Sequence, residues 1–185
     1  SFLTGDAARI ALPKSMSDCL FSRFGVMFFK DAKQAFLHLR SSLKPGGRIA
    51  FSCWSALDHN LWMLSVRETI SRYIDLPNLE PRAPGPFAFA EKDYINEILR
   101  YASFKNISIN PWSGKISIGH QENTPKQAAQ FLLRSLSIAQ LLNDDPRLNK
   151  EIIQNELMQK LQEFSNSSGV YAPAQAWLVT ASLDG

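Results

Sequence analysis

The segment Leu43–Trp54, with the sequence LKPGGRIAFSCW, restricts the possible folds more than any other stretch of this chain. It follows a helical pattern, contains a Pro-Gly-Gly turn and continues as an apolar run. Apolar runs of this kind are typical of parallel strands that are buried on both faces. Such a strand needs a neighbour on each edge and helices on both faces. The segment therefore predicts an α/β domain with further strands around it.

The residues before this segment predict another strand and a helix. Asp18–Ser22 is a short, almost wholly apolar run, which we interpret as a strand buried on both faces. Asp31 offers an N-cap, and apolar residues then recur at helical spacing as far as Leu43. The first third of the chain therefore predicts strand, helix, strand, with the second strand over Arg48–Trp54 and a right-handed crossover.

The middle of the chain predicts two helices, a loop and short strands. The helices are expected over Leu61–Ile74 and Glu91–Ala102, separated by a loop over Leu76–Phe89 that contains four prolines. Alternation of apolar and polar residues predicts strand segments at Asn106–Ile109 and Lys115–Ile118.

Two more helices and a final strand follow. Thr124 and Pro125 predict the start of the first of these helices, and Asp145 predicts the cap of the second. The expected apolar positions of the two helices are Phe131, Leu132, Leu136 and Ala139, and then Ile153, Leu157, Leu161 and Phe164. A last strand is predicted over Ala176–Ala181. The helical pair forms a predicted insertion over residues 122–166.

Composition narrows the class of protein. The net charge is +3, and the Lys and Arg residues are scattered rather than clustered, so we do not expect nucleic acid as the main partner. Cys19 and Cys53 each sit inside an apolar run and are interpreted as buried small hydrophobes in a reducing compartment, with a disulfide or a zinc site as the alternative. No apolar run approaches the roughly 20 residues of a membrane span. The start lacks a signal-peptide pattern, so we expect a soluble cytoplasmic protein.

Four segments resemble a known family when they are taken in order. They are FSRFGVMFFKD (Phe21–Asp31), AFLHLRSSLKPGGRIAFSCW (Ala35–Trp54), APGPFAFAEKD (Ala83–Asp93) and AWLVTAS (Ala176–Ser182). Together they resemble class I S-adenosylmethionine-dependent methyltransferases of the type grouped with ubiquinone and menaquinone biosynthesis enzymes. The resemblance spans nearly the whole chain, from Gly5 to Ser182.

The resemblance implies a Rossmann-like α/β fold with a mostly parallel sheet and an antiparallel last strand between the fifth and sixth. Ser1–Gly5 then resembles the end of the third strand, and Asp18–Ser22 and Arg48–Trp54 the fourth and fifth. Asn106–Ile118 would supply the sixth strand and Ala176–Ser182 the seventh. Residues 1–185 therefore look like the C-terminal portion of a single methyltransferase domain. The first two strands, the glycine-rich loop and the acidic residue for the ribose are expected upstream. A complete small α/β domain is the alternative.

The resemblance also implies a site for the cofactor S-adenosylmethionine. Asp6 matches the residue that accepts a hydrogen bond from the adenine amino group, with the Ala7 amide beside it, although Asp6 could instead only cap the next turn. Ser22, Arg23, Phe24 and Gly25 follow the fourth strand, beneath the sulfonium. Arg23 departs from the small polar residue of some relatives, and it could reach a substrate oxygen or form a structural salt bridge. Gly25 would allow close approach of a ligand or simply make a turn.

Aromatic residues after the strand ends predict an apolar acceptor pocket. These residues are Phe28, Trp54, Trp62, Phe87 and Phe89. An aromatic stripe that belongs to the core is the alternative for the phenylalanines. His59 is the one candidate general base in this region, because an imidazole titrates near neutral pH, but it could also be only solvated.

The chemistry expected from the resemblance is methyl transfer to a small apolar or aromatic acceptor. Transfer from a sulfonium mainly requires alignment of nucleophile, methyl and sulfur, so it needs neither a triad nor a metal. The alternative is a non-catalytic small-molecule-binding or dimerisation module, in which an exposed strand edge pairs with a second copy. A homo-oligomer is therefore a further expectation.

Overall fold

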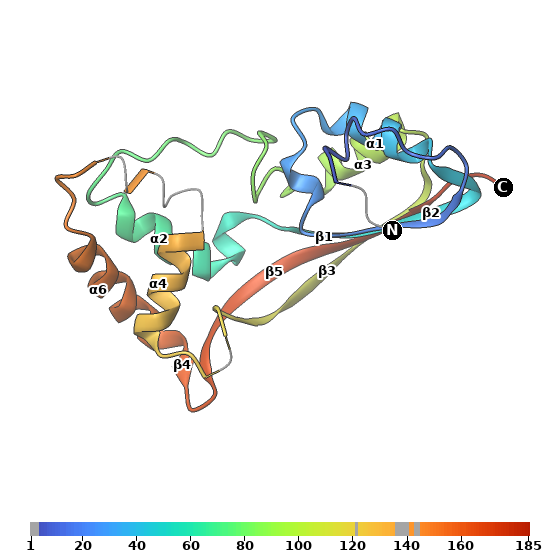
Figure 1. The fold of residues 1–185 in the computed structure, drawn as a ribbon. Coiled ribbons are helices and arrows are strands. Elements are labelled where there is room, and N and C mark those ends of the chain that lie inside the picture. The colour runs from blue at the N-terminus through green and yellow to red at the C-terminus, as the bar shows by residue number, and fades with distance from the viewer. Residues whose placement is uncertain (1–3, 121, 136–140, 143–144) are drawn as a thin grey trace. The chain divides into compact units, whose positions relative to one another are not determined.

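The computed structural model describes residues 4–120, 122–135, 141–142 and 145–185 (Figure 1). The chain divides into two compact units. The first, which we call the sheet unit, comprises Ser1–Ala56, Leu79–Trp112 and Gln175–Gly185. The second, the helical unit, comprises Leu57–Asn78 and Ser113–Ala174. The helical unit is larger than the predicted insertion over 122–166, because it also contains Leu57–Asn78, which follows the second predicted strand.

The sheet has the strand order predicted from the resemblance. Its strands are β1 (Ser17–Arg23), β2 (Leu43–Trp54), β3 (Lys105–Ser117) and β5 (Gly169–Ser182), in the spatial order β1-β2-β5-β3. β1 runs parallel to β2, whereas β5 runs antiparallel to β2. The sheet is therefore mixed, and its last strand lies between the strands that match the fifth and the sixth. A short strand, β4 (Ser165–Asn166), pairs with the start of β5.

Local sequence signals account for the strand–helix–strand unit. The Asp31 carboxylate accepts a hydrogen bond from the Gln34 amide at 3.1 Å and caps α1 (Ala32–Arg40), as predicted. β2 begins at Leu43, before the predicted turn. Between Ser17 and Cys19 the β1 register jumps from Leu43 to Arg48, so the Pro-Gly-Gly segment bulges out of the ladder instead of ending the helix in a separate turn.

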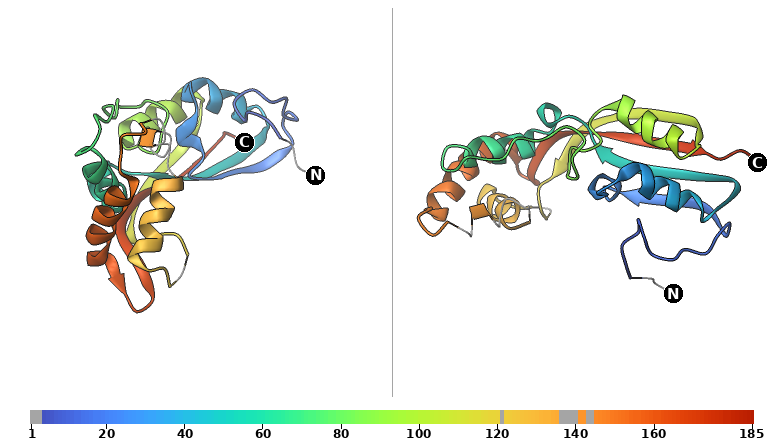
Figure 2. Two further views of the ribbon diagram at one scale, coloured as in Figure 1. Left: turned by 60° about the vertical axis from the view of Figure 1, so that its left-hand side comes forward. Right: turned by 90° about the horizontal axis from the view of Figure 1, so that it is seen from above.

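The core of the sheet unit lies between the sheet and two helices on one face, α1 and α3 (Lys92–Tyr101), which Figure 2 shows side by side. Phe36 of α1 packs edge-on against Phe51 of β2, with ring centroids 5.5 Å apart. Ile95, Ile98 and Leu99 of α3 are fully buried, which confirms the amphipathic helix predicted there. The short 3₁₀ helix η1 (Val26–Phe28) adds Val26 and Met27 to this core.

The burial predicted for β1 is wrong. Phe21 is 78% exposed and Cys19 is exposed, so only one face of the strand is covered. Within the described residues, β1 pairs with β2 alone and forms an edge of the sheet. A strand is buried on both faces only when other elements cover both faces. Here α1 covers only one face of β1. Cys53, in contrast, is fully buried as predicted, and both thiols are free.

The helical unit contains α2 (Leu61–Ile70), α4 (Pro125–Ser135) and α6 (Lys150–Leu161). The predicted Asp145 cap of α6 is wrong, because Asn149 accepts hydrogen bonds from the Glu151 and Ile152 amides at 3.1 and 3.2 Å. The Asp145 carboxylate instead pairs with Arg147 at 2.7 Å. The predicted stripe of Ile153, Leu157 and Leu161 is fully buried, whereas Phe164 lies in the 3₁₀ helix η3 (Gln162–Phe164).

Other element boundaries differ from the predictions. α4 begins as predicted, with the Thr124 hydroxyl accepting from the Gln127 amide at 3.3 Å, but Phe131 is 43% exposed. Leu136 and Ala139 lie outside the described residues, as does most of Ser1–Gly5. β3 is one long strand where two segments were predicted, because its polar middle stays in the ladder. In the described ranges, no helix combines the length and apolar character that a membrane crossing requires.

Candidate functional site

The carboxyl ends of β1 and β2 lie next to each other, because the two strands are parallel and Arg23 pairs with Ser52. Ligands in open α/β sheets bind at this edge. The pairing brings together five of the predicted site residues, which come from two separate parts of the sequence. These residues are Ser22, Arg23, Phe24, Gly25 and Trp54.

Phe24 and Trp54 form a stacked aromatic pair at this edge. Their ring centroids are 4.1 Å apart and their planes are inclined by 19°. Phe24 has φ +54°, which is rare for a bulky residue and costs about 1–3 kcal/mol. Its amide donates to the Ser52 carbonyl at 3.0 Å, which continues the ladder past the end of β1. The pair itself contributes about 0.5–1.5 kcal/mol, so the stack and the ladder together hold a strained backbone.

Met27 anchors the surroundings of this pair. The Trp54 amide lies 3.2 Å from the Met27 sulfur, and the Met27 carbonyl accepts from the Gly85 amide at 3.0 Å. The second contact ties the proline-rich loop to η1. The Ser55 hydroxyl donates to the Gln175 carbonyl at 3.1 Å, which links the end of β2 to β5. Hydrogen bonds that involve the main chain therefore hold the carboxyl ends of β1 and β2 in place.

Gly25 is favoured by limited space rather than by an unusual backbone angle. Its φ is −103°, which any residue adopts. A Cβ at this position would lie 3.1 Å from the Ser22 hydroxyl, which is closer than ordinary contacts. Ser22 is half-buried, whereas Arg23 is exposed. Because Gly25 has no side chain, the backbone just after the end of β1 is accessible.

Asp6 caps a turn ahead of β1. Its side-chain oxygen accepts from the Ala8 amide at 2.9 Å, and its carboxylate lies 3.8 Å from Arg9. The turn-cap alternative to adenine binding is therefore present in the structure. Both Asp6 and Ala7 are exposed, and their contact with adenine stays a prediction.

The aromatic residues predicted for the acceptor pocket divide into two groups. Phe28 is 57% exposed and Phe87 is half-buried, in keeping with surface positions near the strand ends. Phe89 is 1% exposed and packs edge-on against Phe51 at 6.2 Å. The pocket role of Phe89 is therefore wrong, because its ring fills the core between the sheet and α3.

Trp62 and His59 belong to the helical unit, whereas the other predicted site residues lie in the sheet unit. Trp62 is 7% exposed, and its indole N–H lies 3.4 Å from the Asn60 side-chain oxygen. Its ring is therefore buried instead of standing in an open pocket. His59 is half-exposed, in the 3₁₀ helix η2 (Leu57–His59), and its Nδ1 lies 3.9 Å from the Asp58 carboxylate. Its role as a base stays a prediction.

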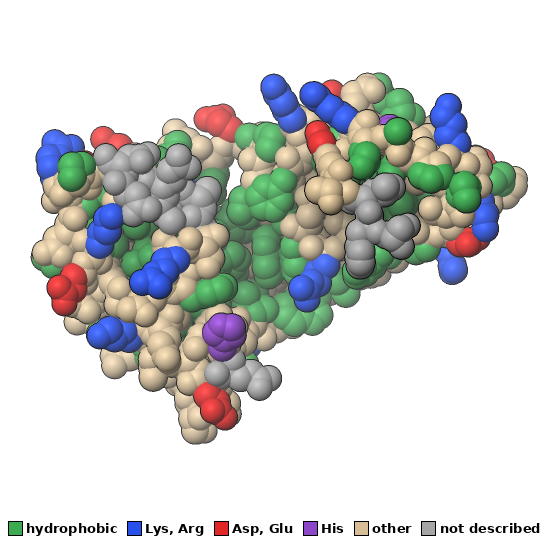
Figure 3. All heavy atoms as spheres, in the orientation of Figure 1, with side chains coloured by type: hydrophobic (Ala, Val, Ile, Leu, Met, Phe, Trp, Pro, Cys, Tyr) green, Lys and Arg blue, Asp and Glu red, His purple; other side chains and the backbone are tan. Residues whose placement is uncertain are grey.

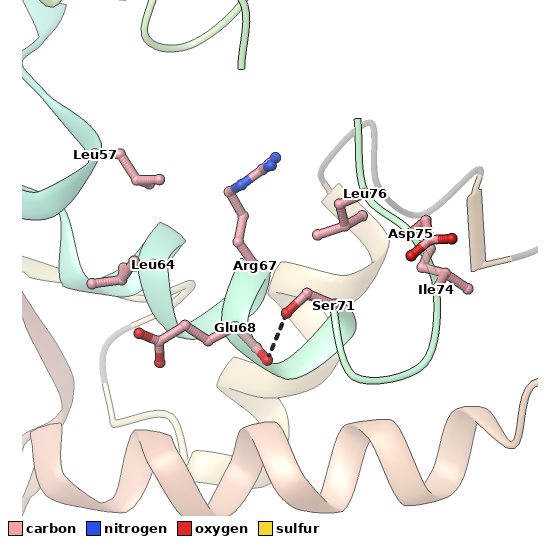
Figure 4. A pocket seen from close by; sticks show the side chains of 8 residues that line it. All are labelled: Leu57, Leu64, Arg67, Glu68, Ser71, Ile74, Asp75 and Leu76. Carbon is pink, nitrogen blue, oxygen red and sulfur yellow. Dashed lines mark hydrogen bonds between the residues drawn. The ribbon is translucent and has the colours of Figure 1, made fainter. Parts of the chain in front are cut away.

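The helical unit contains a pocket of about 380 Å³ that the sequence did not reveal (Figure 4). It lies along α2 and the loop that follows. Arg67 donates to the Pro77 carbonyl at 2.9 Å, and Glu68 pairs with Lys160 at 2.6 Å. The lining residues are Leu57, Leu64, Arg67, Glu68, Ser71, Ile74, Asp75 and Leu76. Side chains of both charges thus share an open, partly apolar wall.

Charge and metal chemistry are weak around these sites. Lys and Arg side chains are scattered over the face drawn in Figure 3. In the part of the chain that the structure describes, no three His, Cys, Asp or Glu residues are placed to hold a metal ion. Burial raises the pKa of the Cys53 thiol to about 12, so this residue is an inert core thiol and not a nucleophile.

The N-terminal part of the chain matches a protein family. Residues 1–51 match the family model described as a methyltransferase domain. This segment contains β1 and α1 and runs into β2 as far as Phe51, so it includes the end of β1 with Ser22 and Gly25. No curated protein sequence matches the chain significantly.

Solved structures share the fold. A candidate methyltransferase from Bacillus halodurans is 12% identical, with a TM-score of 0.57 over 100% of this chain and 78% of its own. YcgJ from Bacillus subtilis is 13% identical, with a TM-score of 0.53 over 98% and 70%. Phosphoethanolamine N-methyltransferase 2 from Haemonchus contortus, solved with phosphomonomethylethanolamine and S-adenosylhomocysteine, is 18% identical, with a TM-score of 0.45 over 97% and 36%.

These comparisons fit the geometry described above. The chain covers 78% of the Bacillus halodurans protein and 36% of the Haemonchus contortus enzyme. The strand order β1-β2-β5-β3, with β5 antiparallel, is the order that the resemblance implied. The match over residues 1–51 and the fold shared with solved methyltransferase-type structures agree with the fold that the resemblance implied.

Proposed function

We propose that the complete protein transfers a methyl group from S-adenosylmethionine to a small apolar acceptor at the carboxyl ends of β1 and β2. The observation that carries the proposal is the stacked Phe24–Trp54 pair, with Phe24 at a positive φ, at the ligand edge of a sheet with this strand order. Strained residues cluster at functional sites, since a purely structural turn would relax to a residue that tolerates the backbone.

The residues present fit one side of the cofactor. Asp6 has an exposed carboxylate with one oxygen on the Ala8 amide and the other 3.8 Å from Arg9, so an adenine amino group would take the place of Arg9 at the second oxygen. Gly25 carries no side chain at the end of β1, so a ligand can approach the backbone there. When bound, S-adenosylmethionine supplies the electrophilic methyl group. Phe24 and Trp54 would exclude water and hold the acceptor in line, and alignment of this kind can supply about 7–11 kcal/mol.

His59 is the proposed base when the acceptor must lose a proton. An imidazole takes up a proton near neutral pH, and the side chain of His59 is half-exposed and therefore free to exchange it with water.

We further propose that an upstream segment completes the sheet beside β1 and carries the glycine-rich loop and the ribose-binding acid. The support comes from the strand pairing and the side-chain exposure of β1. Within the described residues it pairs on one edge only, and Phe21 on its open face is 78% exposed. Sheets with parallel strands are normally covered on both faces, and an open edge invites pairing with another strand.

The test is calorimetric titration of S-adenosylhomocysteine into the full-length protein and into residues 1–185. The full-length protein is expected to bind with a micromolar dissociation constant, and residues 1–185 at least about 100-fold more weakly, because a large share of the cofactor contacts is then missing. Asp6→Ala should lower the affinity of the full-length protein about fivefold to tenfold. Asp18→Ala, which removes an exposed carboxylate at the other end of β1, should leave it unchanged. A full-length protein that binds no S-adenosylhomocysteine would refute the proposal.

A non-catalytic dimerisation module is the second candidate, and the open edge of β1 favours it. Sedimentation velocity separates the two. Dimerisation of the full-length protein that is abolished by Phe21→Lys, together with absent cofactor binding, would support the module.

For the location we propose the cytoplasm, since Cys19 and Cys53 are both free thiols, as is usual in a reducing compartment.

A further inference from the structure

The sheet unit contains a pocket at the opposite end of its strands from the candidate site. Its volume is about 530 Å³, which lies within the range of about 300–1,000 Å³ that is usual for small-molecule sites. Asn106 on its wall donates from its side chain to the Ser182 hydroxyl at 2.9 Å, and Ser182 pairs with Arg48 at the start of the β2–β5 ladder. Trp54, at the other end of that ladder, lies about 20 Å further along β2 at roughly 3.3 Å per residue. The pocket is therefore separate from the candidate methyl-transfer site.

The polar side chains that line this pocket all carry hydrogen-bond donors. They are Asn96, Arg100, Ser103, Lys105 and Asn106. Among the described residues that line it, none has a carboxylate, and Phe104 and Ile107 supply the apolar part of the wall. The pocket of the helical unit, in contrast, contains the carboxylates of Glu68 and Asp75. A wall with many donors and no acid is complementary to an anion.

Much of this donor capacity is unused. Within the described residues, neither the Arg100 guanidinium nor the Ser103 hydroxyl makes a hydrogen bond or an ion pair, and both residues are exposed. Lys105 pairs with the Asp184 carboxylate, so the positive charge of Arg100 is the one that the pocket leaves uncompensated. A guanidinium presents its donors in a planar fork, which matches two oxygens of a phosphate at once.

Ser103 occupies a backbone position at which glycine is the usual residue. Its amide donates to the Arg100 carbonyl and the Phe104 amide donates to the Leu99 carbonyl, both at 2.9 Å, which is the hydrogen-bond pattern of a Schellman motif. The left-handed residue of the motif is Ser103, with φ +60°. A serine is strained there, whereas a glycine is not. The chain thus keeps a hydroxyl on the pocket wall at a cost in stability.

The same two hydrogen bonds make the end of α3 more compatible with an anion. The last carbonyls of a helix lack partners inside the helix and carry partial negative charge, which would repel a phosphate. Here the carbonyls of Leu99 and Arg100 accept from the main chain of the following turn. Glu97, the closest acid along α3, pairs with Lys33 instead of with Arg100.

We propose that this pocket binds the phosphate group of a small molecule, with Arg100 and Ser103 as its main ligands. A phosphate fits better than a single carboxylate because it offers more acceptor oxygens to donors that are spread over the end of α3, the turn and the start of β3. The pocket is larger than one phosphate group requires, so the ligand has an organic part. The proposal does not depend on methyl transfer, because its residues lie away from the carboxyl ends of β1 and β2.

The test is calorimetric titration of inorganic pyrophosphate into the full-length protein at low ionic strength. Malonate, a dicarboxylate of similar size, is the second probe. Wild type is expected to bind pyrophosphate with a dissociation constant of about 0.1 mM, the affinity that two or three charge-assisted hydrogen bonds supply. Malonate should bind about fivefold more weakly or less, because it offers fewer oxygens to the same donors.

Two variants test the ligands of the pocket. Arg100→Gln removes the charge and should weaken pyrophosphate binding about tenfold. Ser103→Gly should weaken it about threefold and at the same time raise the midpoint of urea denaturation, because glycine relieves the strained φ. A general loss of structure cannot produce these opposite effects. Arg134→Gln, at an exposed arginine in the last turn of α4, is the matched control and should leave the affinity unchanged.

The possible results separate the site from a nonspecific attraction of anions. Wild type that does not bind pyrophosphate would overturn the proposal, as would binding that Arg100→Gln and Arg134→Gln weaken equally. Malonate that binds as tightly as pyrophosphate would overturn the assignment of a phosphate. If Arg100→Gln does not fold, Ser103→Gly decides alone, and unchanged affinity in that variant would then refute the site.

Discussion

The buried thiol of Cys53 makes the stability of the sheet unit depend on pH in a direction that the structure specifies. Cys53 is fully buried in the core, and its sulfur lies 4.0 Å from the Phe89 carbonyl. Burial raises the pKa of the folded thiol from 9.0 to about 12. A raised pKa stabilises the fold fully below pH 9, where both states are protonated. That contribution is lost as the pH rises towards 12, because only the unfolded state then ionises.

The magnitude follows from the difference between the two pKa values. Each pH unit above 9 removes about 1.4 kcal/mol of the free energy of unfolding, so the full interval is worth about 4 kcal/mol. Between pH 8 and pH 10.5 the loss is about 2 kcal/mol. Cys53→Ala abolishes this titration. The variant should therefore be less stable than wild type at pH 8, by about 1 kcal/mol for the lost packing, and equally or more stable at pH 10.5.

The assay is urea denaturation followed by tryptophan fluorescence at both pH values. Cys19→Ala removes an exposed thiol and is the matched control, and its difference from wild type should be the same at both pH values. Iodoacetamide provides a second readout, since Cys19 should react in the folded protein and Cys53 only after unfolding. Wild type and Cys53→Ala that lose stability in parallel, within about 0.5 kcal/mol, would contradict the reasoning.

Two further stability predictions test local features of the helical unit. Gly169→Ala should cost about 1–3 kcal/mol by urea denaturation, because φ is +125° and a Cβ would lie 3.0 Å from the Glu122 backbone nitrogen. Gly46→Ala, where the surroundings are open, should cost less, and the reverse order would contradict the steric argument. Asn149→Ala should lower the free energy of unfolding by about 1 kcal/mol through loss of the α6 cap. Asp145→Ala should leave helix content by circular dichroism unchanged, and an equal loss in both variants would count against the cap assignment.

Helices were predictable where a few adjacent residues decide the outcome. The start of α1 follows from Asp31, whose side chain bonds to an amide three residues away. The apolar spacing of α3 and α6 likewise matched their buried faces. The cap of α6 was mistaken because Asp145 and Asn149 are both capping residue types. The choice depended on Arg147, which pairs with Asp145 and holds it outside the helix.

Burial in the sheet was less predictable than the strands themselves. Asp18–Ser22 and Arg48–Trp54 are both apolar runs, and both form strands. Ile49, Phe51 and Cys53 are buried because they lie on the face of β2 that packs against the helices. Phe21 and Cys19 are exposed because they lie on the opposite face, beside Ala50 and Arg48, although their sequence context resembles that of Cys53. Burial of a strand residue depends on which elements cover its face of the sheet, and the tertiary fold decides that.

The sequence by itself determined which residues end the two parallel strands, and hence where a ligand edge forms, because strand ends follow from local turn residues. It also determined the order of the elements and the family that they resemble. Only the tertiary structure placed Phe24 against Trp54, turned the Phe24 backbone to a positive φ, and moved Phe89 into the core. The physical reason is that parallel pairing through Arg23 and Ser52 joins segments distant in sequence, and no local pattern records that register.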